Sequence, residues 1–189
     1  MHFVIGLVLS GAAAEPARPF GSRVQTALAQ DRPSVPPEQR YLYVAMPGSD
    51  VADPDRSVRI LVFDITNAHR FVRRIPVWPA VDGENAEVVR GTAASARDGR
   101  FYVSTTRRLA AIDLKTDTVV WERTYDSRCC DRIAVSPDGR TIYAPAFGSP
   151  RWHVIDAATG ERRATVGVTG WPRDTIYSRD GRHAYLAAW

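Results

Sequence analysis

The sequence has only two cysteines among its 189 residues, and they are adjacent, at Cys129 and Cys130. Two neighbouring cysteines without a second Cys-x-x-Cys pair or a nearby pair of histidines do not assemble the tetrahedral site that zinc prefers. The three aspartates of the 47–57 loop also lack the alternation and the glycine of a defined calcium loop. We therefore expect no metal site.

Catalytic motifs are also missing. The chain has no Ser-His-Asp order, no Gly-rich phosphate loop and no paired-carboxylate arrangement. We assign no catalytic residue, and the sequence leans away from an enzyme.

Positive charge is present without a basic run. The formal net charge is +4, and the cations are nearly all arginines, scattered as separate pairs at 73–74, 107–108 and 162–163. A nucleic-acid surface would show a basic stripe or interleaved aromatic residues. We expect no nucleic-acid partner; charges at solvated sheet edges would instead oppose edge-to-edge pairing.

No hydrophobic run is long enough for a membrane span. The apolar run within residues 1–14 is too short, so we expect no transmembrane segment. It resembles the hydrophobic part of a secretory signal, with small residues at 12–14 as a possible cleavage site. The usual basic segment before the hydrophobic run is missing, since only His2 follows Met1 there. We expect a signal peptide at 1–14, a disordered leader at 15–39 and a periplasmic or secreted protein. The alternatives are a mis-set start codon and a disordered tail.

The chain does contain a repeated unit of short strands. Its clearest copy is 129–160, where the apolar Ile133–Val135 leads into Ser-Pro-Asp-Gly and a β-branched, aromatic strand at Thr141–Ala144 follows. Pro fixes φ and Gly accepts positive φ, so the tetrapeptide suits a tight turn between strands. A third strand at 152–156 and a second turn complete the copy.

Two marks repeat in phase along the chain. The turn glycines Gly99, Gly139 and Gly181 are 40 and 42 residues apart, and aspartates that close an apolar strand are 49 and 43 residues apart, at positions 64, 113 and 156. A period of forty-odd residues made only of short strands is typical of propeller blades. The sequence therefore predicts an all-β fold, a β-propeller of four-stranded antiparallel blades.

The predicted blades lie at about 41–77, 88–125, 129–168 and 172–189. Two whole and two partial blades cannot close a ring, and closure is what removes long edges from a propeller. We therefore expect an N-terminal fragment, or a truncated gene product, of a longer protein with the rest of the propeller missing. We expect the intact ring to have seven blades.

The repeat resembles the YVTN-type β-propeller repeats, which are grouped with the propeller subunits of quinoprotein amine dehydrogenases. The closest matches are Ile133–Tyr143, which contains Ser-Pro-Asp-Gly, and Val154–Val168, which contains Val-Ile-Asp and Thr-Gly; the resemblance covers 41–189. It implies the fold and leaves the activity open, because the motif encodes turns and strand packing.

One segment, Leu109–Glu122, is similar to the tryptophan-docking repeat of pyrroloquinoline-quinone dehydrogenases. It has Asp117 where that repeat has Gly, and the other blades have no equivalent Trp. We interpret Trp121 as core packing between blades. No cofactor is expected, with pyrroloquinoline quinone as the alternative.

Candidate binding residues follow from aligning the blades on their Asp-Gly turns. Residues just before each innermost strand should ring the mouth of the central channel, where propellers generally place ligands. These residues are Arg90, Asp131, Arg132, Arg173 and Asp174. The ring predicts a site for an anionic or polar small molecule, or for a protein; the alternative is a set of inter-blade salt bridges.

The cysteine pair precedes Asp131. A trans peptide holds adjacent Cα atoms about 3.8 Å apart, below the usual disulfide range of about 4.4–6.8 Å. In an exported protein, however, the two sulfurs of Cys129 and Cys130 would be expected to pair with each other. The alternatives are two buried thiols, or partners in an absent C-terminal part.

Taken together, these residues indicate an exported, non-catalytic propeller scaffold that binds a ligand or a protein at its channel face. The alternative is a propeller subunit of a quinoprotein-type dehydrogenase, or a propeller lactonase or hydrolase.

Overall fold

The computed structural model describes residues 39–48, 53–81, 87–126 and 129–189, which belong to one compact unit. The expected signal peptide, and all but the last residue of the expected leader, lie outside the described residues. One short 3-10 helix, η1 (Ile65–Asn67), interrupts a chain of strands. No helix in the described part of the chain has the length and apolar character needed to cross a membrane.

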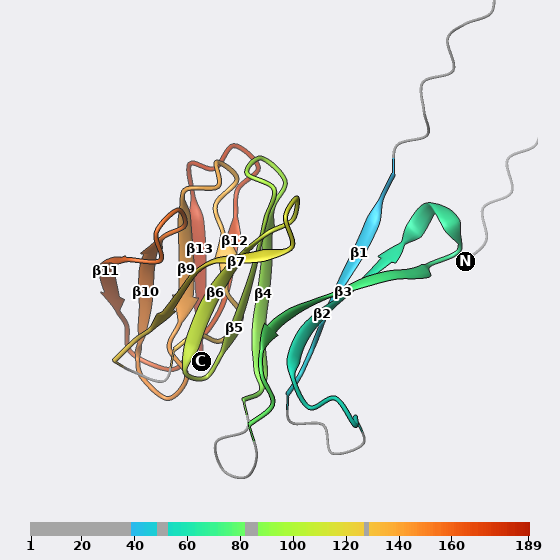
Figure 1. Cartoon of the computed structure of the whole chain (residues 1–189). Coiled ribbons are helices and arrows are strands. Elements are labelled where there is room, and N and C mark those ends of the chain that lie inside the picture. The colour runs from blue at the N-terminus through green and yellow to red at the C-terminus, as the bar shows by residue number, and fades with distance from the viewer. Residues whose placement is uncertain (1–38, 49–52, 82–86, 127–128) are drawn as a thin grey trace, which may run out of the picture. The chain divides into compact units, whose positions relative to one another are not determined.

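The strands form four antiparallel sheets in chain order (Figure 1). The first two sheets contain β1 (Tyr41–Met46), β2 (Val58–Asp64) and β3 (Arg70–Trp78), then β4 (Val89–Ser95), β5 (Arg100–Thr105), β6 (Arg108–Asp113) and β7 (Thr118–Thr124). The third and fourth contain β8 (Ala134–Val135), β9 (Thr141–Pro145), β10 (Arg151–Asp156) and β11 (Arg162–Gly167), then β12 (Pro172–Tyr177) and β13 (Ala184–Ala188). Two sheets have four strands, and the predicted all-β fold of four-stranded antiparallel blades, some of them partial, is confirmed.

The sheet β4–β7 has a hydrophobic core on each face. Alternate side chains of a strand face opposite sides. In β5, Val103 therefore packs toward β1–β3, whereas Tyr102 packs toward β8–β11. β6 does the same, with Ile112 facing one sheet and Leu109 the other, and all four of these side chains are buried. This double burial explains why β5 and β6 are nearly continuous apolar runs.

Trp121 lies in the core between β4–β7 and β8–β11, as expected. Its ring centroid is 6.1 Å from that of Tyr102, and its indole Nε1 donates a hydrogen bond of 3.2 Å to the carbonyl of Ala157 in the next sheet. A Cβ added to Gly160 would lie 2.6 Å from the Trp121 ring. The side chain thus joins the two sheets and fills the space beside the β10–β11 turn.

The two sequence marks of the repeat have separate structural roles. At the β8–β9 turn, the amide of Gly139 donates to the Ser136 carbonyl at 2.8 Å, and Gly139 has a φ of +71° that suits glycine. At the β10–β11 turn, the Asp156 carboxylate accepts hydrogen bonds from the amides of Ala158 and Thr159. Both marks therefore encode local turns.

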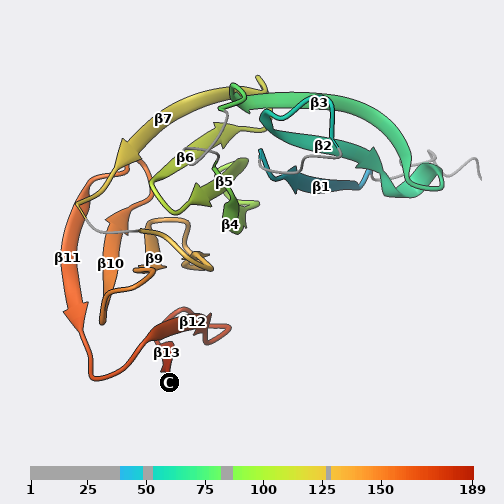
Figure 2. The ribbon, with the colours of Figure 1, turned by 90° about the horizontal axis from the view of Figure 1, so that it is seen from below.

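The first strands of neighbouring sheets contact one another. β4 lies against β8, and β8 lies against β12, while β5, β6 and β7 follow β4 in order across its sheet (Figure 2). A Cβ added to Gly91 would lie 2.7 Å from the amide nitrogen of Ile133 and 2.9 Å from that of Arg132. This close approach brings the beginnings of successive first strands together at one end of the sheets, which we call the mouth end.

Candidate functional site

The structure brings the five predicted binding residues to the mouth end, in two hollows. The polar hollow, of about 430 Å³, includes three of them. It is lined by Val89, Arg90, Gly91, Thr92, Arg132, Ile133, Asp174 and Thr175. The aromatic hollow, of about 400 Å³, includes the other two and is lined by Asp131, Ala146, Phe147, Gly148, Trp171, Pro172, Arg173 and Trp189.

The polar hollow is held by contacts between sheets. The Arg132 guanidinium Nε lies 3.8 Å from the Asp174 carboxylate, and the Arg132 amide donates to the Arg90 carbonyl at 3.4 Å. The charged pair therefore joins one sheet to the next, as the salt-bridge alternative describes.

The position of the five residues relative to the strands differs in part from the prediction. Asp131 and Arg132 precede β8, but Arg90 lies inside β4, and Arg173 and Asp174 lie inside β12. The expectation that all five precede the first strands is wrong for these three. β4 and β12 both start pairing with their neighbouring strands before the position that the alignment predicts. Each pairing contains a register irregularity, at 89–91 in β4 and at 172–175 in β12. Aligning the Asp-Gly turns does not reveal such an irregularity.

The aromatic hollow combines rings with cations. The Arg90 guanidinium lies 4.5 Å from the centroid of the Phe147 ring, and the Arg173 guanidinium lies 5.0 Å from that of Trp189. Asp131 is buried, and its amide donates to the Pro145 carbonyl at 2.8 Å. Cations over aromatic faces are attracted by the ring quadrupole, so each ring orients its arginine.

Sequence reasoning missed these rings. Phe147 lies in the β9–β10 loop, Trp171 just before β12, and Trp189 at the end of the sequence. The signal that could have found Phe147 is topological. In a four-stranded antiparallel meander, the loop between the second and third strands lies at the same end as the start of the first strand.

Cys129 and Cys130 lie beside the mouth but face the core. The structure joins them by a disulfide across a cis peptide, with Cα atoms 3.2 Å apart. Both residues are fully buried in the cluster between β4–β7 and β8–β11. The Ser104 hydroxyl donates to the Cys130 carbonyl at 2.7 Å, which fixes this backbone against the preceding sheet.

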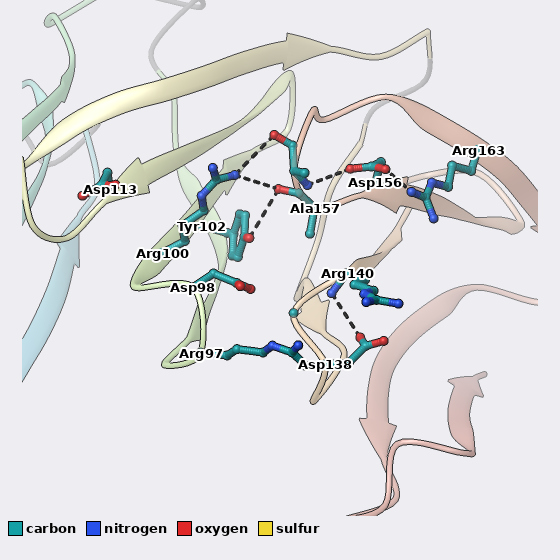
Figure 3. Close-up of a pocket in the computed structure, with 12 residues that line it drawn as sticks. Arg97, Asp98, Arg100, Tyr102, Asp113, Asp138, Arg140, Asp156, Ala157 and Arg163 are labelled. Atoms are coloured by element: carbon teal, nitrogen blue, oxygen red, sulfur yellow. Dashed lines mark hydrogen bonds and ion pairs between the residues drawn. The ribbon is translucent and has the colours of Figure 1, made fainter.

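A third hollow, which sequence reasoning also missed, lies between the sheets β4–β7 and β8–β11 at their Asp-Gly turns, the end opposite the mouth. Figure 3 shows the side chains that line it. We call it the inter-blade pocket; its volume is about 510 Å³. Its charged lining residues are Arg97, Arg100, Arg140, Arg163, Asp98, Asp113, Asp138 and Asp156. The sequence contains one pattern that could have pointed to it: an arginine follows each of the three Asp-Gly turns that repeat in phase, at positions 100, 140 and 182.

Hydrogen bonds within their own turns favour the anionic form of three carboxylates of the inter-blade pocket, those of Asp113, Asp138 and Asp156. Hydrogen bonds from the amides of Lys115 and Thr116 hold the pKa of Asp113 below its usual value, and the Ser136 hydroxyl does the same for Asp138. Burial opposes the shift at Asp156, but hydrogen bonds from two amides and from a guanidinium still lower its pKa.

The described residues contain no group of three or more His, Cys, Asp and Glu side chains placed to hold a metal ion. Within the 47–57 loop, Asp53 and Asp55 form ion pairs with Arg59, and Asp55 also pairs with Arg74. The loop's third aspartate, Asp50, lies outside the described residues.

Comparison with known proteins supports the fold. No protein-family model matches this chain, and no curated protein matches it. Its structure is similar to that of hydrazine synthase from Kuenenia stuttgartiensis, a β-propeller-containing protein, with a TM-score of 0.55 and 18% sequence identity. The match covers 71% of this chain and 39% of that chain, so this chain spans about two-fifths of its neighbour. At this identity, the likeness indicates a β-propeller-like fold alone.

Proposed function

We propose that this chain is part of an exported, non-catalytic β-propeller scaffold of the YVTN type that binds a small ligand at its mouth end. The ligand would carry an anionic group beside an aromatic or apolar body. One observation supports this most strongly. Guanidinium groups from three successive repeats gather at the mouth end: Arg90 and Arg132 line the polar hollow, and Arg173 lines the aromatic hollow with Phe147 and two tryptophans. Arg90 also lies over the Phe147 ring.

The contacts of these arginines favour an anion. Arg132 pairs with Asp174, whereas Arg90 and Arg173 form no ion pair with a described carboxylate and instead lie over rings. The Nε of Arg90 is buried and makes no hydrogen bond among the described residues. A guanidinium that stacks on a ring still presents its N–H edge to a carboxylate or phosphate, which it binds in a bidentate manner.

The export part of the proposal is supported by two features. Residues 1–14 resemble a secretory signal, and the two cysteines are joined as a disulfide, a bond that persists in oxidising compartments. Sequencing the N-terminus of the protein from a secreting host tests export: an intact Met1 in the exported fraction would contradict cleavage. No specific observation among the described residues favours the enzymatic alternative.

The binding proposal can be tested with 2-naphthoate, which joins an aromatic body to a carboxylate. Isothermal titration should show saturable binding, and each of Arg90→Gln and Arg173→Gln should weaken it about tenfold, because each removes a charge-assisted hydrogen bond of about 1.5 kcal/mol. The matched control is Arg179→Gln, an exposed arginine that lines neither hollow.

A neutral analogue separates charge from packing. The proposal predicts that 2-naphthamide binds more weakly than 2-naphthoate to the unsubstituted protein and is insensitive to the two mouth variants. Equal affinities of the two variants and the unsubstituted protein for 2-naphthoate would contradict binding at the mouth.

A further inference from the structure

We propose that the inter-blade pocket is a second binding site, for a small organic dianion with two separate oxyanion groups. Arg97, Arg100 and Arg140 would bind it. The site is distinct from the mouth, because it lies at the β4–β5 and β8–β9 turns, at the other end of the same sheets.

The walls of this pocket are complete sheets. One wall is the four-stranded sheet β4–β7 and the other is the four-stranded sheet β8–β11. The carbonyl of Ala157 ties them together, since it accepts hydrogen bonds from the Tyr102 hydroxyl at 3.4 Å and from the indole of Trp121 at 3.2 Å. The pocket therefore does not depend on the two-stranded sheet β12–β13 or on β1–β3.

Tyr102 contributes a neutral surface to the pocket. Burial raises the pKa of its hydroxyl, so the phenol stays protonated and keeps donating to Ala157. The Arg100 guanidinium lies beside it and donates from one nitrogen to the carbonyls of Ala157 and Ala158, at 3.4 and 3.3 Å. These bonds hold Arg100 against the next sheet and leave its other N–H groups for a ligand.

Each carboxylate of the pocket already has donors of its own. The Asp98 carboxylate accepts from the Ser95 hydroxyl at 2.9 Å, and the Asp138 carboxylate accepts from the Ser136 hydroxyl and the Arg140 amide. Asp113 and Asp156 accept from two turn amides each, and Asp156 also pairs with Arg163. The pocket is lined by four carboxylates and four arginines, so their formal charges balance. The carboxylate oxygens already accept hydrogen bonds from nearby amides, hydroxyls or Arg163, so they have little need of further donors.

The arginines are in the opposite situation. The side chains of Arg97 and Arg140 make no hydrogen bond or ion pair at bonding distance with any described residue, although both lie near enough to Asp138 to lower its pKa. Figure 3 shows Arg97 reaching from the first wall toward the Asp138 turn, with Arg140 on the second wall. The pocket therefore has surplus hydrogen-bond donors, and a ligand rich in acceptor oxygens would use them.

The size of the pocket and the origin of its arginines favour two oxyanion groups. A volume of about 510 Å³ suits a small organic molecule and exceeds what one carboxylate fills. Arg97 and Arg140 come from different walls, so each can bind a separate carboxylate through its planar fork.

The test is a chemical-shift titration of the full chain with succinate, using acetate as the one-carboxylate control. We expect saturable shifts at the amides of the 97–100 and 138–140 turns with succinate, and at least tenfold weaker binding of acetate. Arg97→Gln and Arg140→Gln should each weaken succinate binding about tenfold, which corresponds to about 1.4 kcal/mol. Arg182→Gln is the matched control, because Arg182 has the same place in the next turn but does not line the pocket.

The outcomes separate this site from the mouth. Arg90→Gln and Arg173→Gln should leave the succinate shifts unchanged, so either site can fail without the other. Equal binding of succinate and acetate, or inorganic phosphate binding as tightly as succinate, would overturn the two-group ligand. Unchanged succinate affinity in both pocket variants, each with the unsubstituted protein's amide spectrum outside the pocket, would overturn the site itself.

Discussion

At the scale of single residues, Gly139 does more than reverse the chain at its turn. The Asp98 carboxylate of the preceding sheet lies so close to its Cα that a Cβ there would overlap it, and the Ser95 hydroxyl lies 2.8 Å from the same position. Gly99 has a similar φ, +60° against +71°, but open space around it. Substituting Gly99 therefore tests the cost of the positive φ alone, whereas substituting Gly139 tests the same cost together with a close contact between sheets.

We predict that Gly139→Ala destabilises the protein more than Gly99→Ala does. A positive φ costs an alanine about 1–2 kcal/mol at either position. At position 139, Asp98 must also move and lose its hydrogen bond to Ser95, worth about 1 kcal/mol more. Urea unfolding measures both values.

The double variant Asp98→Ala, Gly139→Ala supplies the control. If most of the extra cost comes from the Asp98 carboxylate, Gly139→Ala should cost much less in the Asp98→Ala background than in the unsubstituted protein, with only the contact to the Ser95 hydroxyl left. Equal costs for the two single glycine variants would contradict close packing between the two turns.

At the scale of elements, β7 is a mostly exposed strand with a single buried side chain, Trp121. Its neighbour Val120 is 45% exposed. β7 is the last strand of the sheet β4–β7. Through Trp121 it also contacts the next sheet, β8–β11.

We predict that Trp121→Ala lowers the free energy of unfolding by about 3–5 kcal/mol, because it leaves a cavity in the core and removes a donor to Ala157. Val120→Ala, on the same strand, should cost less than about 1 kcal/mol, since it is partly exposed. Similar losses for the two variants in denaturant unfolding would show that β7 does not join the sheets.

Element type was predictable from the sequence where the pattern was local. β5 and β9 follow from β-branched and aromatic runs directly after Asp-Gly turns, and β6 follows from a short apolar run that ends at Asp113; each of these patterns lies within a dozen residues. β8 was not predictable in the same way. Of the apolar run Ile133–Val135, only Ala134 and Val135 pair with β9. Ile133 instead packs in the core, with its amide nitrogen close to Gly91 of the preceding sheet.

The candidate site likewise has a part that could be predicted from local sequence and a part that could not. The five charged residues at the mouth could be found by aligning repeats, because position within a repeat fixes the end of the sheet at which a residue lies. The pairing of Arg132 with Asp174, the rings under Arg90 and Arg173, and the inter-blade pocket depend on contacts between sheets, which a single sequence does not encode locally.

At the scale of the whole described unit, both proposed sites depend on one arrangement. Successive repeats must stack face to face, with their first strands touching at the mouth end and their Asp-Gly turns meeting at the other end. The β-propeller-like fold gives this arrangement, and its two ends offer different chemistry. Cations lie over aromatic rings at the mouth, whereas at the turns the guanidinium groups of Arg97 and Arg140 pair with no described residue.

The most direct test of this arrangement is a nuclear Overhauser spectrum of the isotopically labelled protein. Gly91 in β4 lies against the backbone of Arg132 and Ile133, which precede β8 in the next sheet. The structure predicts cross-peaks between the Gly91 α protons and the amide protons of both residues. If cross-peaks within the β4–β5 and β8–β9 pairs are present and these two are absent, successive repeats do not stack at the mouth, and both proposed sites lose their basis.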